Sequence, residues 1–161
     1  MNESYVRTRD RLETYFDKTA SKTWEILTSD LPVSGVRARV RLGRDKMRYV
    51  ILSSLPSNLT GMRVLDAGCG TGQQSIEAAT QFKNCSVTAV DLSLSSLAYA
   101  KRKSMELHIS NIEYTQADIL DLAKLNRKFD VIECTGVLHH MEDPMAGWRV
   151  LVDCLKLGGL M

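Results

Sequence analysis

The sequence predicts an α/β protein built on a doubly wound, mostly parallel sheet. From residue 61 onward, short β-rich runs alternate with longer amphipathic runs that have helical spacing. The first β-rich run also leads directly into a glycine-rich turn, in the stretch VLDAGCGTG. Because parallel strands need crossover connections, and these are right-handed, the alternation favours helices that cover the sheet.

The pattern gives each element in order. Strands are expected at MRVLDA, SVTAVD, NIEYTQAD and FDVIECT. Helices are expected over residues 73–82, 94–107, 120–125 and 144–155. The final LGGLM would only open a fifth strand, and a four-stranded parallel sheet leaves an edge that is normally covered. We therefore expect a core that is truncated at its C-terminus.

Two helices are expected before the first strand. Apolar residues recur at near-helical spacing over residues 6–29, and Leu31-Pro32 ends that pattern. A second helix is expected over residues 36–55, where Pro56 stops it. The chain is accordingly divided into a helical N-terminal cap, residues 1–57, and an α/β core, residues 58–161.

Composition narrows the class of protein. The 161 residues are 44% hydrophobic and 25% charged, which is typical of a soluble globular domain. No apolar run is long enough to span a bilayer, and MNESYVRTRDRLE is too charged for a signal peptide, so we expect a cytoplasmic protein. The four cysteines form no CxxC pair, which favours reduced thiols and predicts no metal site.

The glycine-rich turn indicates a ligand. Gly68, Gly70 and Gly72 follow a G-x-G-x-G spacing, and Asp66 precedes them by two residues. A dinucleotide site spaces its glycines differently and presents a helix N-terminus to a pyrophosphate, which a neighbouring carboxylate would repel. A carboxylate here instead favours a cationic ligand. S-adenosylmethionine, which carries an ammonium and a sulfonium, fits this pattern.

Two further acids end the next two strands. Asp91 could accept both ribose hydroxyls, and Asp118 could accept the adenine amino group while the N–H of Ile119 meets a ring nitrogen. Each acid could also be a helix cap. Three acids at successive strand ends favour binding, because that edge of an α/β sheet is where ligands bind. The expected cofactor-binding residues are Asp66, Ala67, Gly68, Cys69, Gly70, Gly72, Asp91, Leu92, Asp118 and Ile119.

These segments carry a family resemblance. VLDAGCGTG, AVDLS, QADI and FDVIECTGVLHHMEDP together resemble the class I S-adenosylmethionine-dependent methyltransferases, which implies a Rossmann-like core. The leader from LETYFDKTA to GRDKMR resembles bacterial magnesium-protoporphyrin O-methyltransferases, which methylate a propionate carboxylate of the porphyrin. Residues 70–161 instead resemble methyltransferase domains associated with tetratricopeptide-repeat proteins, whose substrate is undefined.

The resemblance also indicates catalytic residues. His139 and His140 follow the fourth strand, and the porphyrin methyltransferases imply catalysis by a loop histidine and an N-terminal tyrosine that match His140 and Tyr15. An ordinary loop histidine and an apolar-face tyrosine are the alternatives. A carboxylate acceptor is ionised at pH 7 and needs no strong base.

The second helix carries an arginine face. Arg37, Arg41, Arg44 and Arg48 share one side of it, either as a solvated face, as a clamp for acidic substrate groups or as a contact for an anionic membrane. Nucleic acid is not expected, since no aromatic residues interleave with the arginines. The expected activity is O-methylation of a small acidic molecule, with the magnesium protoporphyrin IX propionate as candidate. The alternatives are a methyltransferase of undefined small-molecule or protein substrate, or a truncated cofactor-binding module without turnover.

Overall fold

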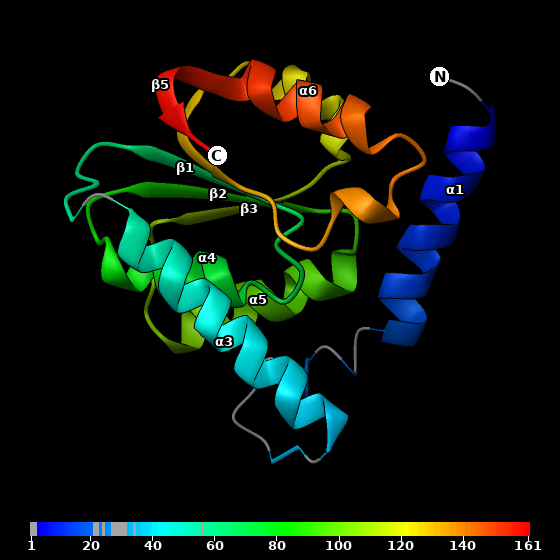
Figure 1. Cartoon of the computed structure of the whole chain (residues 1–161), viewed down its shortest axis with the longest axis horizontal. Helices are drawn as coiled ribbons and strands as arrows, with labels where there is room; N and C mark the ends of the chain where they lie inside the picture. The colour runs from blue at the N-terminus through cyan, green and yellow to red at the C-terminus, as the bar shows by residue number, and fades with distance from the viewer. Residues whose placement is uncertain (1–2, 21–22, 24, 27–31, 34, 56) are drawn as a thin grey trace.

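The structure is a computed structural model that describes residues 3–20, 23, 25–26, 32–33, 35–55 and 57–161. Five parallel strands form one sheet with the order β3-β2-β1-β4-β5 (Figure 1). In chain order these are β1 (Arg63–Ala67), β2 (Ser86–Asp91), β3 (Ile112–Gln116), β4 (Phe129–Glu133) and β5 (Leu155–Leu160). The predicted α/β class with a doubly wound parallel sheet is therefore confirmed.

Helices cover both faces of this sheet. On one face lie α4 (Gln73–Gln81) and α5 (Leu94–Glu106), while η2 (Ile119–Leu125) and α6 (Pro144–Cys154) pack together on the other (Figure 1). The chain winds outward in one direction from β1 to β3 and then returns to β4 on the opposite side of β1. The carboxyl ends of β1 and β4 therefore form a topological switch point, where open α/β sheets bind their ligands.

The core follows the two-residue period of the strands. Leu65 of β1 points toward the α6 layer and shares a cluster with Ile132 and Leu151. Val64, its neighbour, points to the other face and packs with Ala79 and Phe82. Both faces are thus apolar, as expected for a parallel sheet that is covered on each side.

The helices begin at polar caps that directly follow strands or loops. The Ser93 hydroxyl accepts from the N–H of Ser96 at the start of α5, and Asp118 accepts from the N–H of Leu120 at the start of η2. Asp143 accepts two backbone N–H groups of α6, which has Pro144 in its first turn. The expected helices of the core are confirmed, and residues 119–125 form a 3₁₀ helix.

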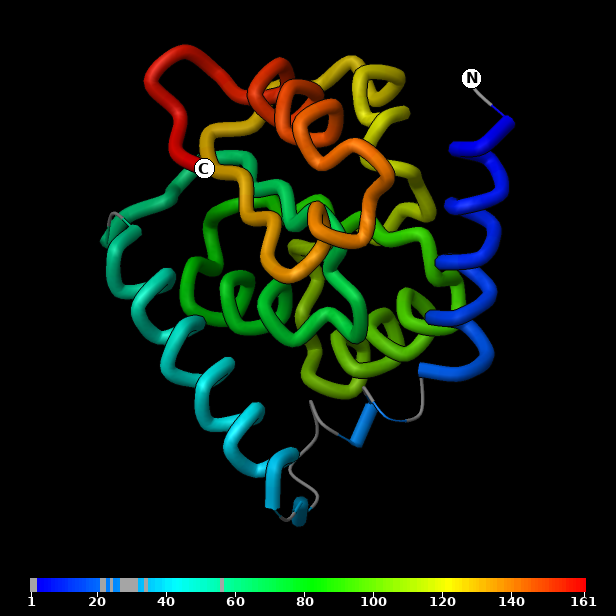
Figure 2. The backbone as a smooth tube through the Cα atoms, turned by 45° about the vertical axis from the view of Figure 1, so that its right-hand side comes forward, coloured from blue at the N-terminus to red at the C-terminus, as the bar shows by residue number. Residues whose placement is uncertain are grey.

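The N-terminal segment is helical but broken. The described part of the expected 6–29 helix consists of α1 (Glu3–Thr14) and a π-helical turn, η1 (Tyr15–Ala20), and the remainder falls mostly outside the described residues. The second helix, α3 (Val36–Ser54), is confirmed. Figure 2 shows α1 beside the sheet and separate from α3. Leu52 of α3 and Leu55, which follows that helix, pack against the core. The division at residue 57 remains a prediction.

The fifth strand corrects the count of four. The last residue of α6 is Cys154 and the first residue of β5 is Leu155, so no loop separates the two elements. Lys156 of β5 forms an ion pair with Asp130 of β4, with 2.7 Å between Nζ and Oδ2. A Cβ at Gly159 would lie 2.9 Å from the Asp130 carbonyl oxygen, so only glycine fits this close approach. Among the described residues, no helix is long and apolar enough to cross a membrane.

Candidate active site

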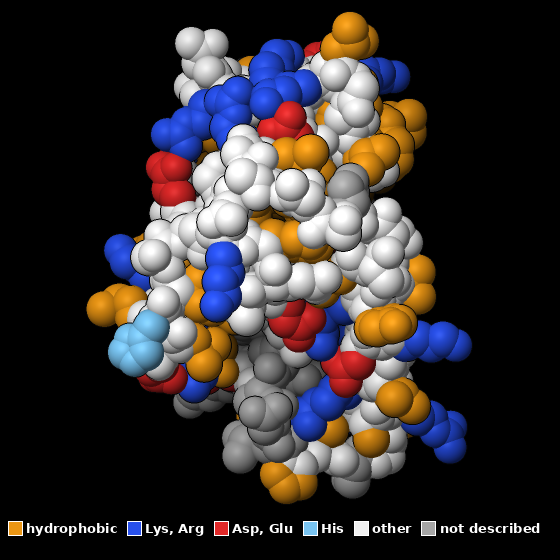
Figure 3. Space-filling view, turned by 90° about the vertical axis from the view of Figure 1, so that its left-hand side faces the viewer, with side chains coloured by type: hydrophobic (Ala, Val, Ile, Leu, Met, Phe, Trp, Pro, Cys, Tyr) orange, Lys and Arg blue, Asp and Glu red, His pale blue; other side chains and the backbone are white. Residues whose placement is uncertain are grey.

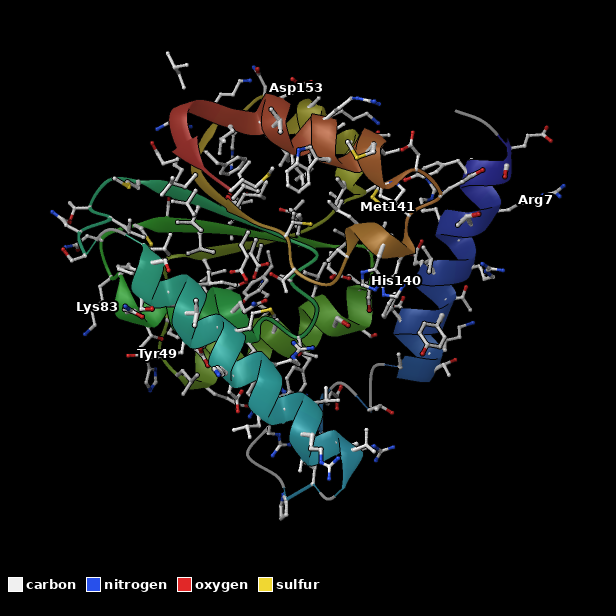
Figure 4. The ribbon with its side chains drawn as sticks, in the orientation of Figure 1. Arg7, Tyr49, Lys83, His140, Met141 and Asp153 are labelled. Atoms are coloured by element: carbon white, nitrogen blue, oxygen red, sulfur yellow. The ribbon has the colours of Figure 1, made fainter. Side chains whose placement is uncertain are left out.

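A cavity of about 300 Å³ lies at the carboxyl ends of the strands. Its walls come from the glycine-rich loop after β1, the residues that follow β2 and β3, the segment after β4, and the inward sides of α1 and α3. Figure 4 shows His140 and Met141 in the segment between β4 and α6, beside α1, whereas Arg7 points away from it. The cavity is therefore enclosed jointly by the sheet and the N-terminal helices.

The glycine-rich loop closes one end of this cavity. The N–H groups of Gly68 and Cys69 both donate to the carbonyl oxygen of Val90, which fastens the loop to β2. Gly68 has φ +82°, and a Cβ there would lie 2.2 Å from the side chain of Val137. Gly70 has φ +53° and nothing within 4 Å of its Cβ position, so open space lies beside it. Close packing within the protein explains Gly68, and the cavity lies beside Gly70.

Gly72 serves the fold and does not line the cavity. Its φ is +76°, and a Cβ would lie 2.5 Å from the Cβ of Ala100 on α5. At both Gly68 and Gly72 an added Cβ would collide with the protein itself, so close packing accounts for these two glycines. Gly72 still lets α4 begin close to α5, which places the loop.

Asp91 connects the glycine-rich loop to the end of β2. Its Oδ2 accepts from the N–H of Gly70 at 2.8 Å, and its Oδ1 accepts from the N–H of Ser93 at 2.8 Å. Burial raises the pKa of Asp91 above its usual range, although these backbone donors oppose that shift. Each oxygen keeps a second acceptor position, so the carboxylate can still accept two hydroxyl groups from the cavity.

Asp118 lies at the end of β3 and is contacted by α1. Its Oδ1 accepts from the N–H of Leu120 at 3.0 Å, and its Oδ2 accepts from the hydroxyl of Tyr5 at 2.5 Å. The alternatives of cap and binding residue are therefore compatible, because Asp118 caps η2 and also lines the cavity. Tyr5 was missed by the sequence analysis, since no pattern in ESYVRTRD announces a contact 113 residues away.

Asp66 is buried behind the glycine-rich loop and does not line the cavity. Burial and the neighbouring charge of Glu133 raise its pKa to about 7, although the hydroxyl of Ser75 donates to its Oδ2 at 2.5 Å. Glu133 is its register partner on β4. Asp66 is therefore protonated more readily than an exposed carboxyl group, and a nearby cation would drive it toward the charged form.

The cavity gathers most of the predicted cofactor-binding residues. Those that line it are Gly68, Cys69, Gly70, Asp91, Leu92, Asp118 and Ile119. Ala67 is fully buried in the core, so only its backbone could contribute. Together with Asp66 and Gly72, it forms a layer behind the residues that face the cavity.

Arg48 of α3 is one of the four arginines that the sequence predicts on one side of this helix, and the structure gives it an environment of its own. Its Nε donates to Glu77 of α4 and its Nη2 to Asp45, each at 2.8 Å. Its Nη1 is the one buried side-chain nitrogen or oxygen without a hydrogen-bond partner among the residues that the structure describes. Arg48 also lines the cavity, so its positive charge favours an anionic group there.

The arginine face is divided by its surroundings. Arg44 lines the cavity one turn before Arg48, and burial together with the charge of Arg48 lowers its pKa. Arg41 donates to the carbonyl oxygen of Ile26 at 2.6 Å, and Arg37 is exposed. Helical spacing correctly groups these residues, but only the tertiary packing selects the two that line the cavity.

The two predicted catalytic residues have different environments. His140 lines the cavity, its ring contacts Phe16 edge-on with centroids 5.6 Å apart, and burial and His139 lower its pKa. Tyr15 is half exposed and lies outside the cavity wall, with its ring against Phe16 at 5.2 Å. Tyr5 of α1 and Phe16 of η1 are aromatic residues that line the cavity.

This fold and site define a class of enzyme. Residues 64–159 match the methyltransferase domain family, and the chain belongs to the class I S-adenosylmethionine-dependent methyltransferases. Its cofactor is S-adenosylmethionine. The predicted family, cofactor and enzyme class are confirmed.

Its relatives include porphyrin methyltransferases. The chain is 40% identical over 157 residues to magnesium-protoporphyrin O-methyltransferase from Rhodobacter capsulatus, covering 97% of this chain and 68% of that protein. It resembles the crystal structure of magnesium protoporphyrin IX methyltransferase from Synechocystis PCC 6803 with bound SAM, with a TM-score of 0.83 and 27% identity over 92% of this chain and 72% of that one.

The chain also resembles other methyltransferases. Ubiquinone biosynthesis O-methyltransferase from Pseudomonas syringae pv. tomato is 36% identical over 104 residues, which are 64% of this chain and 44% of that protein. The chain thus spans about two thirds of the Rhodobacter relative and less than half of this one. The likeness that includes the N-terminal helices extends beyond the porphyrin methyltransferases, since ubiquinone biosynthesis O-methyltransferase from Escherichia coli is 29% identical over 145 residues, which are 89% of this chain and 56% of that protein.

Proposed function

We propose that S-adenosylmethionine binds in the cavity between the glycine-rich loop, Asp91 and Asp118. The open space beside Gly70 leaves room for the cofactor, and Asp91 accepts its ribose hydroxyls. Asp118 and the N–H of Ile119 meet its adenine, while the buried Asp66 favours its positive charge. Ala67, Cys69 and Leu92 shape the walls around these groups, and Gly72 positions the loop.

Arg48 completes this assignment. Arg48 lines the cavity, and its guanidinium charge suits the carboxylate at the amino-acid end of S-adenosylmethionine. The polar contacts of the cavity thereby match both ends of the cofactor.

The methyl acceptor that we propose is a carboxylate of a small acidic molecule, namely a propionate of magnesium protoporphyrin IX. The observation that carries this proposal is the 40% identity over 97% of the chain, which includes α1, η1 and α3 as well as the core. Leu12, Phe16, Met47 and Met141 give the cavity apolar walls that suit a macrocycle edge, and Arg44 gives a cation that suits a propionate.

The size of the cavity limits how the acceptor can bind. About 300 Å³ lies at the lower end of the range for ligand pockets, roughly 300–1,000 Å³. The macrocycle would therefore place one propionate in the cavity, and the rest of the ring would lie partly outside it. The N-terminal helices would contact its apolar face.

The residues in the cavity would mainly orient the reactants. When bound, S-adenosylmethionine supplies an electrophilic methyl group, which passes to the acceptor oxygen as the methyl–sulfur bond breaks. Since a carboxylate is already ionised at pH 7, His140 has no proton to remove. With its lowered pKa, His140 is neutral at that pH and can donate a hydrogen bond that aligns the acceptor.

The acceptor is tested with radiolabelled S-adenosylmethionine and magnesium protoporphyrin IX. We expect a methyl ester on the porphyrin, and a rate reduced by about tenfold or more in His140→Ala with unchanged affinity for S-adenosylhomocysteine. Tyr15→Phe tests the second predicted catalytic residue. His108→Asn is the matched control, because His108 is exposed and Asn tolerates its positive φ.

Other outcomes would redirect the assignment. Labelling of a phenol or of a protein, with the porphyrin untouched, would contradict the proposed acceptor and favour a methyltransferase of a different substrate. Tight cofactor binding without methyl transfer to any acceptor would favour a binding module without turnover. Either result leaves the cofactor site itself intact.

We also propose a peripheral contact between α3 and an anionic membrane. The outward side of α3 exposes Val36, Leu42, Tyr49 and Val50, and Arg39 and Lys46 lie among them. The helix carries six basic residues against one acidic residue. Figure 3 shows apolar side chains interspersed with Lys and Arg on the surface of the molecule. Apolar and basic side chains on one helix face suit an anionic lipid surface.

A further inference from the structure

The contact between Tyr5 and Asp118 links the first helix to the end of β3. Tyr5 lines the cavity, and its hydroxyl donates to Oδ2 of Asp118 at 2.5 Å. Asp118 is buried, so its carboxylate has little water to replace a missing donor. In such an environment a hydrogen bond fixes the group that accepts it more firmly than at the surface.

Both oxygens of the Asp118 carboxylate are held by donors on different elements. Oδ1 accepts from the N–H of Leu120 in η2 at 3.0 Å, and Oδ2 accepts from Tyr5 in α1. Two donors from two directions define the plane of the carboxylate. Each oxygen has two acceptor positions, so one position on each remains for a ligand.

Tyr5 remains a donor over the whole working pH range. Burial is the largest cause that raises its pKa, and the hydrogen bond and charge of Asp118 raise it further. The phenol therefore stays protonated, and its hydrogen-bonded proton points toward Asp118. Deletion of the hydroxyl removes this donor and leaves the ring in place.

We propose that Tyr5 is a positioning residue for adenine recognition, because it holds the Asp118 carboxylate in the orientation that accepts the exocyclic amino group of the purine. This inference rests on the proposed cofactor site and adds a residue that the sequence analysis did not name. It gives α1 a part in selecting the base, through the Asp118 carboxylate. A purine without the amino group gains nothing from the oriented carboxylate.

The test compares two ligands in two proteins. S-adenosylhomocysteine and its 6-deamino analogue, in which hydrogen replaces the amino group, are titrated calorimetrically into the wild-type protein and Tyr5→Phe. In the wild type we expect S-adenosylhomocysteine to bind about tenfold more tightly than the analogue. In Tyr5→Phe we expect this ratio to fall about fivefold, because the carboxylate can turn and its unpaired oxygen is less well placed.

Tyr49→Phe is the matched control, since it deletes the same hydroxyl at an exposed position of α3 outside the cavity wall. Its ratio should equal that of the wild type. Equal weakening of both ligands by Tyr5→Phe would show that Tyr5 only fastens α1, and would overturn the inference. A ratio that rises would show that Tyr5 competes with adenine, and would overturn it as well. If neither ligand binds the wild-type protein, the proposed cofactor site fails together with the inference.

Discussion

Asp66 illustrates how one buried side chain couples the site to pH. An acid whose pKa is about 7 when folded, and about 3.9 when unfolded, binds more protons in the folded state between those values. The free energy of unfolding of the ligand-free protein should therefore fall as the pH rises from about 4 to 7. We expect Asp66→Asn to remove more than about 1 kcal/mol of this decrease, measured by denaturant unfolding at pH 5 and pH 8.

Asp153→Asn provides the comparison, because Asp153 is exposed on α6 and far from the cavity (Figure 4). It should change stability equally at both pH values. If Asp66→Asn showed the same difference between pH 5 and pH 8 as the wild type, the protonation of Asp66 would have no part in stability. The amide keeps an acceptor for Ser75, so a fold defect is not the expected cause of any change.

Residues differ in how far their roles can be predicted from sequence. The placement of Asp91 and Asp118 beside one cavity was predictable, because the ends of successive strands meet at one edge of a parallel sheet. The burial of Arg48 and the contact between Tyr5 and Asp118 were not. They depend on how α1 and α3 pack against the sheet, and the two-residue and helical periods carry no information about that packing.

At the scale of elements, strands and helices of the core were predictable from their alternation, whereas β5 was only partly so. A loop or turn residue usually marks the boundary between a helix and a strand, but α6 passes into β5 at Leu155 without one. The register of β5 is also irregular between its pairings with Phe129 and Val131. The strand β5 is defined by its pairing with β4, and the sequence of one segment alone does not show which strand it pairs with.

The outward face of α3 gives the prediction that belongs to this scale. We expect the protein to sediment with vesicles that contain phosphatidylglycerol and to remain free with phosphatidylcholine alone, because basic side chains attract anionic headgroups. The double change Arg39→Glu and Lys46→Glu should lower the bound fraction severalfold. Both side chains are exposed, so the fold should tolerate the change.

The double change Lys101→Glu and Arg149→Glu is the control for α3. It makes the same change in net charge at exposed positions of α5 and α6. If both double variants lost binding equally, the attraction would be a property of net charge, and the proposed role of α3 would be wrong. If only an RNA, and no vesicle, bound the wild type, the surface would serve a different partner.

For the whole molecule, the sheet and the N-terminal helices together make the site. The strands bring Asp91, Asp118 and the glycine-rich loop to one edge, α3 adds Arg48, and α1 adds Tyr5. Further side-chain contacts fasten the N-terminal segment, including those from Asp17 to Ser93 and Ser95. A methyltransferase core alone would have left the cavity open, so the N-terminal segment is part of the site.

The central claim is that the cavity binds the adenosyl cofactor through Asp91. It is tested most directly by calorimetric titration of S-adenosylhomocysteine into the wild type, Asp91→Asn and the exposed control Asp153→Asn. We expect one site per chain, an affinity at least about tenfold weaker in Asp91→Asn, since charge-assisted hydrogen bonds to the ribose are lost, and no change in Asp153→Asn. Equal affinity in the wild type and Asp91→Asn, with both proteins folded by circular dichroism, would contradict the account.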